Sequence, residues 1–255
     1  MASESDVITY GTYLVVDDLL RLQQPRSEPE HPDELLFIVV HQASELWFKA
    51  ILHELHQLIA HLRDGDTLYA LHTMRRVNAL SRIVADQLSA LDTLPPQRFA
   101  QFRGYLGTSS GGQSVQFRAI EALSGLRDEH FVQAVREHGP VPPLVASALE
   151  QPTLQSLFLD LLSRRETTLE QLYLGPGPTA EFLLAEALLE YEQNFQRWRY
   201  LHVQLVERII GPDTGGTGGT LGARYLQHTL KQRFFPELWT VRRRFFVDAN
   251  GAPRP

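Results

Sequence analysis

Two stretches of about thirty residues constrain the fold most, because each has the pattern of one uninterrupted helix. The first, 33–63, follows the proline-rich segment PRSEPEHP at 25–32 and ends before the turn DGD at 64–66. The second, 179–210, lies between GPGP at 175–178 and Gly211-Pro212. Both stretches carry apolar residues on more than one side. Helices of this length and pattern are typical of a bundle whose subunits also pack against one another in an oligomer.

The remaining chain reads as shorter helices joined by proline and glycine breaks. Apolar residues recur at helical spacing, and we expect helices at 9–23, 67–91, 98–103, 113–123, 128–138, 143–149, 152–173 and 223–232. Valine, isoleucine and threonine do not gather into alternating runs between turns, so we expect no strand series. The sequence therefore predicts a single all-α domain over 1–255, with disordered tails at 1–8 and 246–255.

Composition removes several classes of function. The chain has no cysteine, which excludes disulfides, thiolate zinc sites and iron–sulfur clusters and leaves ten histidines and the carboxylates as metal ligands. The net charge is -6 and no basic stripe stands clear of acidic neighbours, so we expect no nucleic-acid partner. The N-terminus has neither the basic start nor the apolar run of a signal peptide. No 18 apolar residues follow one another, so we expect no membrane span and a cytoplasmic location.

Two histidines stand out by their surroundings. His202 lies on an apolar helix just before a glycine-rich turn, and we interpret it as a metal-binding imidazole with that turn lying over a bound group. His41 lies in the middle of the 33–63 helix, one turn after Phe37 on the same face. It is either a core histidine bonded to a carbonyl or a group that exchanges protons near neutral pH. Arg103 lies between aromatic residues and a loop of small residues, where it could bind a carboxylate or form a surface salt bridge.

Other candidate sites fail on spacing. His53 and His56 form HELH, which is not the H-E-x-x-H zinc pattern, so solvated or capping roles are favoured. A carboxylate-bridged di-metal bundle needs Glu-x-x-His on two helices, and the only such pair, Glu28 and His31, lies in the proline-rich break. The loop GGTGGTLG at 215–222 follows a helix instead of a strand and lacks the spacing of a dinucleotide-binding loop, so nucleotide binding is not favoured. The alternative interpretation is a flexible linker.

Four blocks of the chain, taken together, resemble the tryptophan 2,3-dioxygenase family, haem enzymes that open the indole ring of tryptophan with O2. The blocks occur in the family's order and span nearly the whole chain: YGTYL at 10–14, LLFIVVHQASELWFKAILHEL at 35–55, FRGYLGTSSGGQSVQFRAIE at 102–121, and HVQLVERIIG with GTGGT over 202–220. The resemblance implies an all-α fold around a haem b, and a homotetramer.

The resemblance also assigns roles to the two histidines and their neighbours. It implies that His202 is the axial ligand of the haem iron, which agrees with the absence of any thiolate. His41 matches the distal histidine that contacts the indole N–H, and Phe37 matches the aromatic residue packed against that ring.

The same resemblance implies a clamp for the amino-acid end of the substrate. Arg103 matches the arginine that holds the carboxylate, Thr217 matches the threonine near the ammonium and carboxylate, and Phe99 lies where the family has an aromatic residue near that end. Tyr10 and Tyr13 match tyrosines that reach into a neighbouring subunit's pocket, so the pocket would be completed only in the oligomer.

These assignments predict an enzyme of tryptophan catabolism, with O2 as co-substrate and L-tryptophan converted to N-formylkynurenine. One alternative is an oxygenase of specialised metabolism that acts on a substituted tryptophan and inserts a single oxygen atom to give an oxindole-type product. A second is a non-catalytic haem sensor, although a sensor has no need of the amino-acid clamp that Arg103 and Thr217 would form.

The chain departs from the family's pattern at four places. Leu88 stands where a tryptophan is usual, Gly112-Gln113 lacks an intervening phenylalanine, and Leu201 replaces a common arginine. The glycine loop is one residue longer, with Pro212-Asp213 in place of an aromatic-basic pair. Smaller side chains at two aromatic positions suggest a roomier haem environment unless neighbours fill the space, and losing the arginine removes a charge near the haem.

Overall fold

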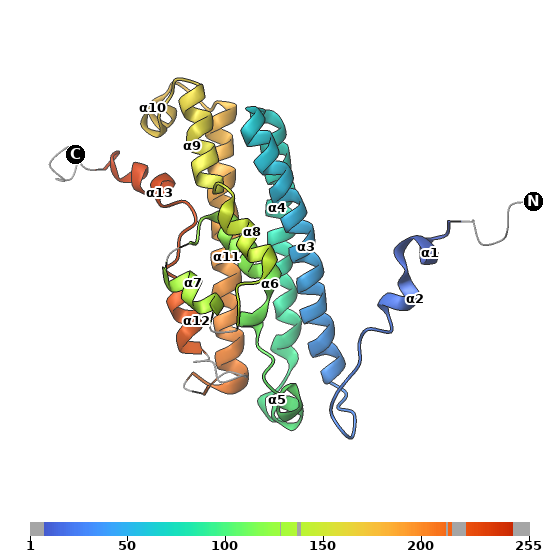
Figure 1. Cartoon of the computed structure of the whole chain (residues 1–255). Coiled ribbons are helices and arrows are strands. Elements are labelled where there is room, and N and C mark those ends of the chain that lie inside the picture. Colours follow the sequence, from blue (N-terminus) through green and yellow to red (C-terminus); the bar gives the residue numbers. More distant parts are fainter. Residues whose placement is uncertain (1–7, 128, 137–138, 213, 216–222, 247–255) are drawn as a thin grey trace, which may run out of the picture.

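Three long helices form the frame of the molecule. In the computed structural model, which describes residues 8–127, 129–136, 139–212, 214–215 and 223–246, α3 (Glu34–Asp64), α4 (Thr67–Gln87) and α11 (Ala180–Ile210) run along the bundle (Figure 1). Helix α4 packs against both α3 and α11. The described residues contain no strand. The expected all-α fold is confirmed, and α3 and α11 each begin and end within one residue of their predicted limits.

Shorter helices surround this frame. The peripheral elements are α1 (Tyr10–Leu14), α2 (Val16–Leu19), η2 (Leu88–Thr93), α5 (Pro96–Arg103), η3 (Gly104–Leu106), η4 (Gly111–Gln113), α6 (Val115–Ser124), α7 (Glu129–Arg136), α8 (Pro143–Glu150), α9 (Leu154–Arg164), α10 (Leu169–Leu174), α12 (Ala223–Thr229) and α13 (Pro236–Arg243). Helix α5 lies at one end of the bundle, while α1 and α2 project away from it (Figure 1).

Local capping chemistry explains where the long helices start and stop. Helix α3 ends at Gly65, whose φ of 78° is the left-handed conformation that glycine adopts without a steric cost. Helix α4 then starts at once, because the Asp66 side chain accepts a hydrogen bond from the backbone N–H of Tyr69. The Thr179 hydroxyl accepts in the same way from Phe182 and caps the start of α11.

Two predicted helices are interrupted. The expected helix over 152–173 is divided into α9 and α10, since Glu166 has a φ of 53° and Thr168 forms a capping box with Gln171 that starts a new helix. The expected helix over 9–23 is divided into α1 and α2 at Val15, whose φ is 52°. Both predictions followed the apolar spacing and missed a backbone reversal within it.

Two other expectations were wrong at helix ends. The helix expected over 67–91 keeps α-helical geometry only to Gln87 and tightens into the 3₁₀ helix η2 from Leu88. The helix expected over 223–232 ends at Thr229, and a further helix, α13, for which no helix was expected, begins with Pro236 in its first turn. Proline suits that position because its missing N–H has no helical partner there.

Two apolar clusters form the interior. The main core joins α3, α4, α6, α8, α9 and α11, with Ile51, Leu55 and Leu58 of α3 fully buried. The second cluster joins the other end of α3 to η2, α5 and α11, and its buried members are Val40, Leu88, Leu91, Leu94, Phe99, Phe102, Leu205 and Ile209. This second cluster encloses the part of the bundle where the candidate site residues lie.

Helix α3 is also the most apolar of the long helices. By length and composition alone it could cross a membrane, and 22% of its most apolar 18-residue window is buried. Its packing against α4 and α6 is that of a core helix in a bundle. Leu35, Val39 and Leu46 nevertheless remain about half exposed on its outer face.

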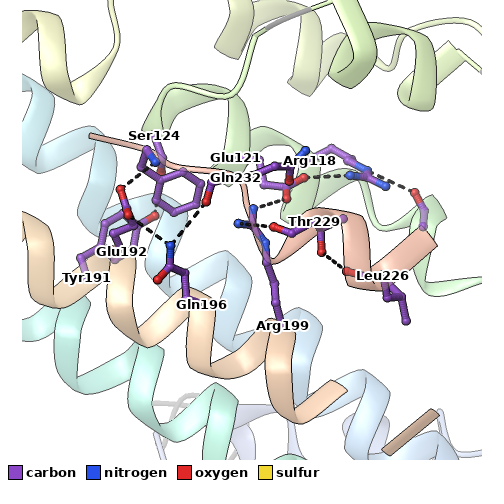
Figure 2. A network of polar contacts seen from close by, with 12 residues as sticks. Arg118, Glu121, Ser124, Tyr191, Glu192, Gln196, Arg199, Leu226, Thr229 and Gln232 are labelled. Atoms are coloured by element: carbon purple, nitrogen blue, oxygen red, sulfur yellow. Dashed lines mark hydrogen bonds and ion pairs between the residues drawn. The ribbon is translucent and has the colours of Figure 1, made fainter. Parts of the chain in front are cut away.

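A buried carboxylate joins the C-terminal segment to α11. Glu192, 1% exposed, accepts hydrogen bonds from the backbone N–H groups of Phe234 (2.7 Å) and Phe235 (2.8 Å) and from Trp239 Nε1 (2.6 Å). It lies beside the Ser124–Tyr191 hydroxyl contact (Figure 2). One side chain therefore pairs three donors that would otherwise be buried without a partner.

Replacing Glu192 by alanine should lower the free energy of unfolding by about 2–4 kcal/mol, because it leaves these donors unpaired. Arg197→Ala is the matched control on the same helix, since Arg197 forms only an exposed ion pair with Asp86 and should cost less than about 1 kcal/mol. Urea unfolding measures both values, and equal effects of the two variants would contradict the anchoring role of Glu192.

Candidate functional site

His41 lies in the half of α3 that faces the second cluster. The residue is accessible to solvent, and burial by the surrounding protein atoms lowers the pKa of its imidazole. The Nδ1 atom lies 2.7 Å from the carbonyl oxygen of Phe37. A carbonyl can only accept, so Nδ1 carries the proton and Nε2 of the neutral ring is left as an acceptor. His41 is thus suited to receive an N–H group.

Aromatic rings line one side of His41. The Phe37 ring centroid lies 4.2 Å from the His41 ring and 5.6 Å from Phe99, and Phe102 lies 5.8 Å from Phe37. Phe37 comes from α3, whereas Phe99 and Phe102 come from α5. Pro95 and Pro96 allow α5 to begin directly after η2, which brings these rings against α3. The resulting wall is apolar, with its rings inclined to one another by 37° to 85°, and it offers the kind of surface against which an indole ring packs.

Arg103 lies at the end of α5, one turn after Phe99 on the same helix face. Its Nη2 atom donates a hydrogen bond of 2.6 Å to the carbonyl oxygen of Gly215, in the segment that follows α11. A guanidinium has five N–H donors, so this contact leaves others for a carboxylate. The Arg103 side chain therefore joins the aromatic wall of α5 to the glycine-rich segment. Thr217, also predicted for this clamp, lies outside the described residues.

His202 projects from α11 into the same region. Its ring packs on Trp198, one turn earlier, with 5.1 Å between the centroids. Burial lowers the pKa of His202 to about 4, and the charge of His41 contributes to the same shift. The imidazole is therefore neutral at pH 7, as a metal ligand must be. The two histidines, 161 positions apart in the sequence, are close enough for a charge on one to affect the other.

The surroundings of His202 fit an iron porphyrin better than a bare metal ion. The described residues contain no group of three or more histidine, cysteine or acidic side chains that could hold an ion. A porphyrin brings its own four nitrogen ligands and needs only an axial imidazole and an apolar pocket. Leu205 and Ile209 of the second cluster provide apolar neighbours on α11. His202 is therefore suited to hold such a group.

Two of the departures noted in the sequence lie in this region. Leu88 is 7% exposed and forms part of the second cluster, and Leu201 packs against that cluster from α11. Each leucine therefore adds apolar surface to the cluster that also contains Leu205 and Ile209 of α11. Nothing in the structure explains why the chain has leucine at these two positions.

The two predicted tyrosines do not join the site of their own chain. Tyr10 and Tyr13 lie on α1, are 79% and 75% exposed, and project away from the bundle (Figure 1). Neither α1 nor α2 has a buried residue. The structure therefore brings His41, Phe37 and Phe99 into contact, with Arg103 on the same face of α5, and leaves these tyrosines on a separate arm.

Sequence reasoning missed two supports of the site. Trp198 lies against His202, and its four-residue spacing on the helix was the available signal. Arg199, 3% exposed, donates to Glu121 of α6 at 2.7 Å and thereby ties α11 to α6 (Figure 2). Of the other histidines considered, His53 and His56 are exposed on α3, and His31 contacts Gln101 of α5.

Comparisons with known proteins agree in a single family. The family model described as Tryptophan 2,3-dioxygenase matches residues 1–152 and 172–245. The tryptophan 2,3-dioxygenase of Anaeromyxobacter dehalogenans is 40% identical over 263 residues, which cover 94% of this chain and 97% of that protein. Those of Kineococcus radiotolerans and Xanthomonas euvesicatoria are each 39% identical, covering 92% and 96% of this chain and 90% and 91% of their own lengths.

The low pKa of His202 predicts a pH dependence of stability in the haem-free protein. The unfolded chain binds a proton near pH 6.5 and the folded chain only near pH 4, so stability should fall as the pH drops through this window, by at most about 3 kcal/mol. Denaturant unfolding of the haem-free protein and of His202→Leu at several pH values isolates this contribution. Identical slopes for the two proteins would contradict burial of His202.

Proposed function

This chain belongs to the tryptophan 2,3-dioxygenase family, and from that premise we propose that it is a haem-dependent oxygenase that inserts both atoms of O2 across the indole 2,3-bond of L-tryptophan to give N-formylkynurenine. The observation that carries the proposal is the contact of His41 with Phe37, which packs on the rings of α5, together with the buried His202 on α11, whose pKa is lowered in part by His41. A cytoplasmic place of action is part of the same proposal.

His202 is the proposed axial ligand of haem b. Its burial keeps the imidazole neutral, and Trp198 restricts the ring on one side. The haem, when bound, supplies the binding and activation of O2, which no side chain of this chain can perform. The contribution of the protein is to present one imidazole from an apolar wall and to hold the organic substrate opposite.

The indole ring is proposed to lie against Phe37 and Phe99, with its N–H directed at His41. The Nε2 atom of His41 is the free acceptor, because Nδ1 is committed to the Phe37 carbonyl. That same hydrogen bond keeps the imidazole from rotating, so the direction of the indole N–H fixes which ring edge faces O2. The lowered pKa of His41 keeps Nε2 unprotonated near neutral pH. His41 thus orients the indole and can hold its proton.

The amino-acid end is proposed to bind Arg103 and Thr217. The guanidinium of Arg103 already contacts Gly215 on one side, which directs its remaining donors within a limited range. A substrate carboxylate pairs with such a fork through two parallel hydrogen bonds. With the indole held by His41 and the carboxylate by Arg103, the substrate is fixed at both ends. This is catalysis by positioning.

The arm formed by residues 8–22 is proposed to complete the pocket of a neighbouring subunit in a homotetramer. Its large apolar side chains are exposed in the single chain, including Tyr10, Tyr13 and Leu20. Leaving so many apolar groups in water is unfavourable, and a second copy of the chain would cover them. The exposed Leu35, Val39 and Leu46 on α3 provide a further surface for the same assembly.

Replacing the two principal residues should separate cofactor binding from substrate binding. His202→Ala should lose the haem absorption spectrum, because no other described side chain replaces the imidazole. Arg103→Ala should keep that spectrum and raise the KM for L-tryptophan by about tenfold or more, since it removes the partner of the carboxylate. His53→Ala is the control and should match the parent protein. A full haem spectrum in His202→Ala would show that the ligand is misassigned.

The arm can be tested by complementation between two defective chains. A chain lacking residues 1–22 has an intact haem site but no arm, and His202→Ala has an arm but no haem site. Each alone should be nearly inactive, and oligomers reassembled from their mixture should regain activity because the arm of one chain enters the pocket of the other. Full activity of the truncated chain alone, or no recovery in the mixture, would contradict the proposed exchange.

A further inference from the structure

We propose that the proline-rich segment 25–33, here called the strap, is a positioning element. It fixes where the guanidinium of Arg103 meets the substrate carboxylate. The inference rests on the proposed function, because it concerns the same clamp. It adds residues that contact neither the indole nor the haem ligand, and it assigns them an effect on one end of the substrate only.

The strap has a fixed shape because a buried carboxylate organises it. Glu34, 1% exposed at the start of α3, accepts the backbone N–H groups of Arg26 (2.7 Å) and Ser27 (3.0 Å) as well as the Ser27 hydroxyl. The Ser27 hydroxyl oxygen in turn accepts the backbone N–H of His31 at 2.8 Å. These donors bind Glu34 either directly or through the Ser27 hydroxyl. The strap is therefore an ordered segment beside the start of α3.

From this position the strap contacts α5 and η3 through polar groups. The His31 Nδ1 atom accepts the backbone N–H of Asp33 at 3.2 Å, so Nε2 carries the proton and donates to Gln101 at 2.9 Å. The Tyr105 hydroxyl donates to the carbonyl of Glu28 at 2.8 Å. These two hydrogen bonds lie on either side of Arg103 in the sequence.

An ion pair and a ring contact complete the connection. Asp33 pairs with Arg98 at the start of α5, and this guanidinium lowers the pKa of the Asp33 carboxyl. The His31 ring packs on Phe102, with 5.1 Å between the centroids. The strap thus holds α5 at its beginning, in its middle and just beyond its end.

Arg103 depends on these contacts because α5 is short. The helix has eight residues, and its next neighbour, η3, has three. So short a helix has little stability of its own and takes its position from what it packs against. The apolar face of α5, with Phe99 and Phe102, is held in the second cluster, whereas the strap contacts are what restrain its polar side. A small shift of that side changes where the guanidinium meets a carboxylate.

The double variant His31→Leu/Tyr105→Phe removes the hydrogen bonds to Gln101 and Glu28, together with the acceptor of the Asp33 N–H and the His31–Phe102 ring contact, and leaves the hydrogen bonds of Glu34 in place. Titration of the haem-loaded protein should show the Kd for L-tryptophan raised about threefold to tenfold, as expected for lost positioning hydrogen bonds. The Kd for tryptamine, which lacks the carboxylate, should change by less than about twofold, and kcat for L-tryptophan should be similarly unaffected. Tyr105→Phe alone should give a smaller change in the same direction.

The control is His53→Leu/Tyr69→Phe, which makes the same chemical changes at exposed positions of α3 and α4 and should match the parent protein for both ligands. Equal weakening of L-tryptophan and tryptamine binding in the strap variant would overturn the inference, as would no change in either. Arg103→Ala distinguishes a failure of the strap's positioning role from a failure of the proposed Arg103 clamp. If it weakens only L-tryptophan while the strap variant does not, the inference alone fails; if it weakens neither ligand, the clamp itself is wrong.

Discussion

The position of α11 along the bundle decides whether a site exists, because it determines where His202 lies relative to His41. Apolar packing alone fixes such a position loosely, since neighbouring turns of a helix offer similar surfaces. Buried polar contacts fix it more sharply. Asn78 of α4 donates to the carbonyl of Ala187 at 2.9 Å and accepts from Asn194 at 3.3 Å, within the seam between α4 and α11.

The ion pair between Arg199 and Glu121 has the same role against α6. Both side chains are almost completely buried, and Glu121 also accepts from Arg118 (Figure 2). A shift of α11 by one turn would leave a buried charge without its partner, which costs several kcal/mol. Arg199 lies three residues before His202, so the restraint acts on the turn that carries the proposed iron ligand. The fold therefore uses its polar interior to specify one arrangement of the two histidines.

The remaining parts of the site come from short elements placed at the end of this frame. The aromatic rings of α5 meet Phe37, and the strap holds the polar side of the same helix. The arm, by contrast, has no buried residue in α1 or α2, and its last residue, Leu22, accepts a hydrogen bond from Gln42 of α3 at 3.1 Å. The residues proposed to hold the indole and the iron thus lie on the packed frame, while the arm proposed to close the pocket extends beyond the bundle.

Much of the fold could be predicted from the sequence, because strong local signals limit the long helices. The limits of α3 and α11 follow from turn residues on either side, and the break at 25–32 follows from three prolines. The division between α9 and α10 was missed although Thr168 and Gln171 form a recognisable capping box. Helix α13 was not predicted, although Pro236 suits the first turn of a helix. Boundaries of this kind depend on single residues within otherwise periodic segments.

Less of the candidate site than of the fold could be predicted from the sequence. Resemblance indicated which residues belong to it, but neither spacing nor composition predicts that His41 and His202 are near neighbours, since that depends on buried contacts between distant segments. The contact of Trp198 with His202 was foreseeable from helical spacing, whereas the strap contacts of His31 and Tyr105 were not. Thr217 lies outside the described residues and stays a prediction.

The number of oxygen atoms that the product takes from O2 tests the proposed function most directly. The reduced, haem-loaded protein would be given L-tryptophan under isotopically labelled O2, and the product would be analysed by mass spectrometry. A site that holds the indole by His41 opposite the ligand His202 predicts a ring-opened product carrying two labelled atoms. A ring-closed product with a single labelled atom, or no consumption of L-tryptophan, would contradict it.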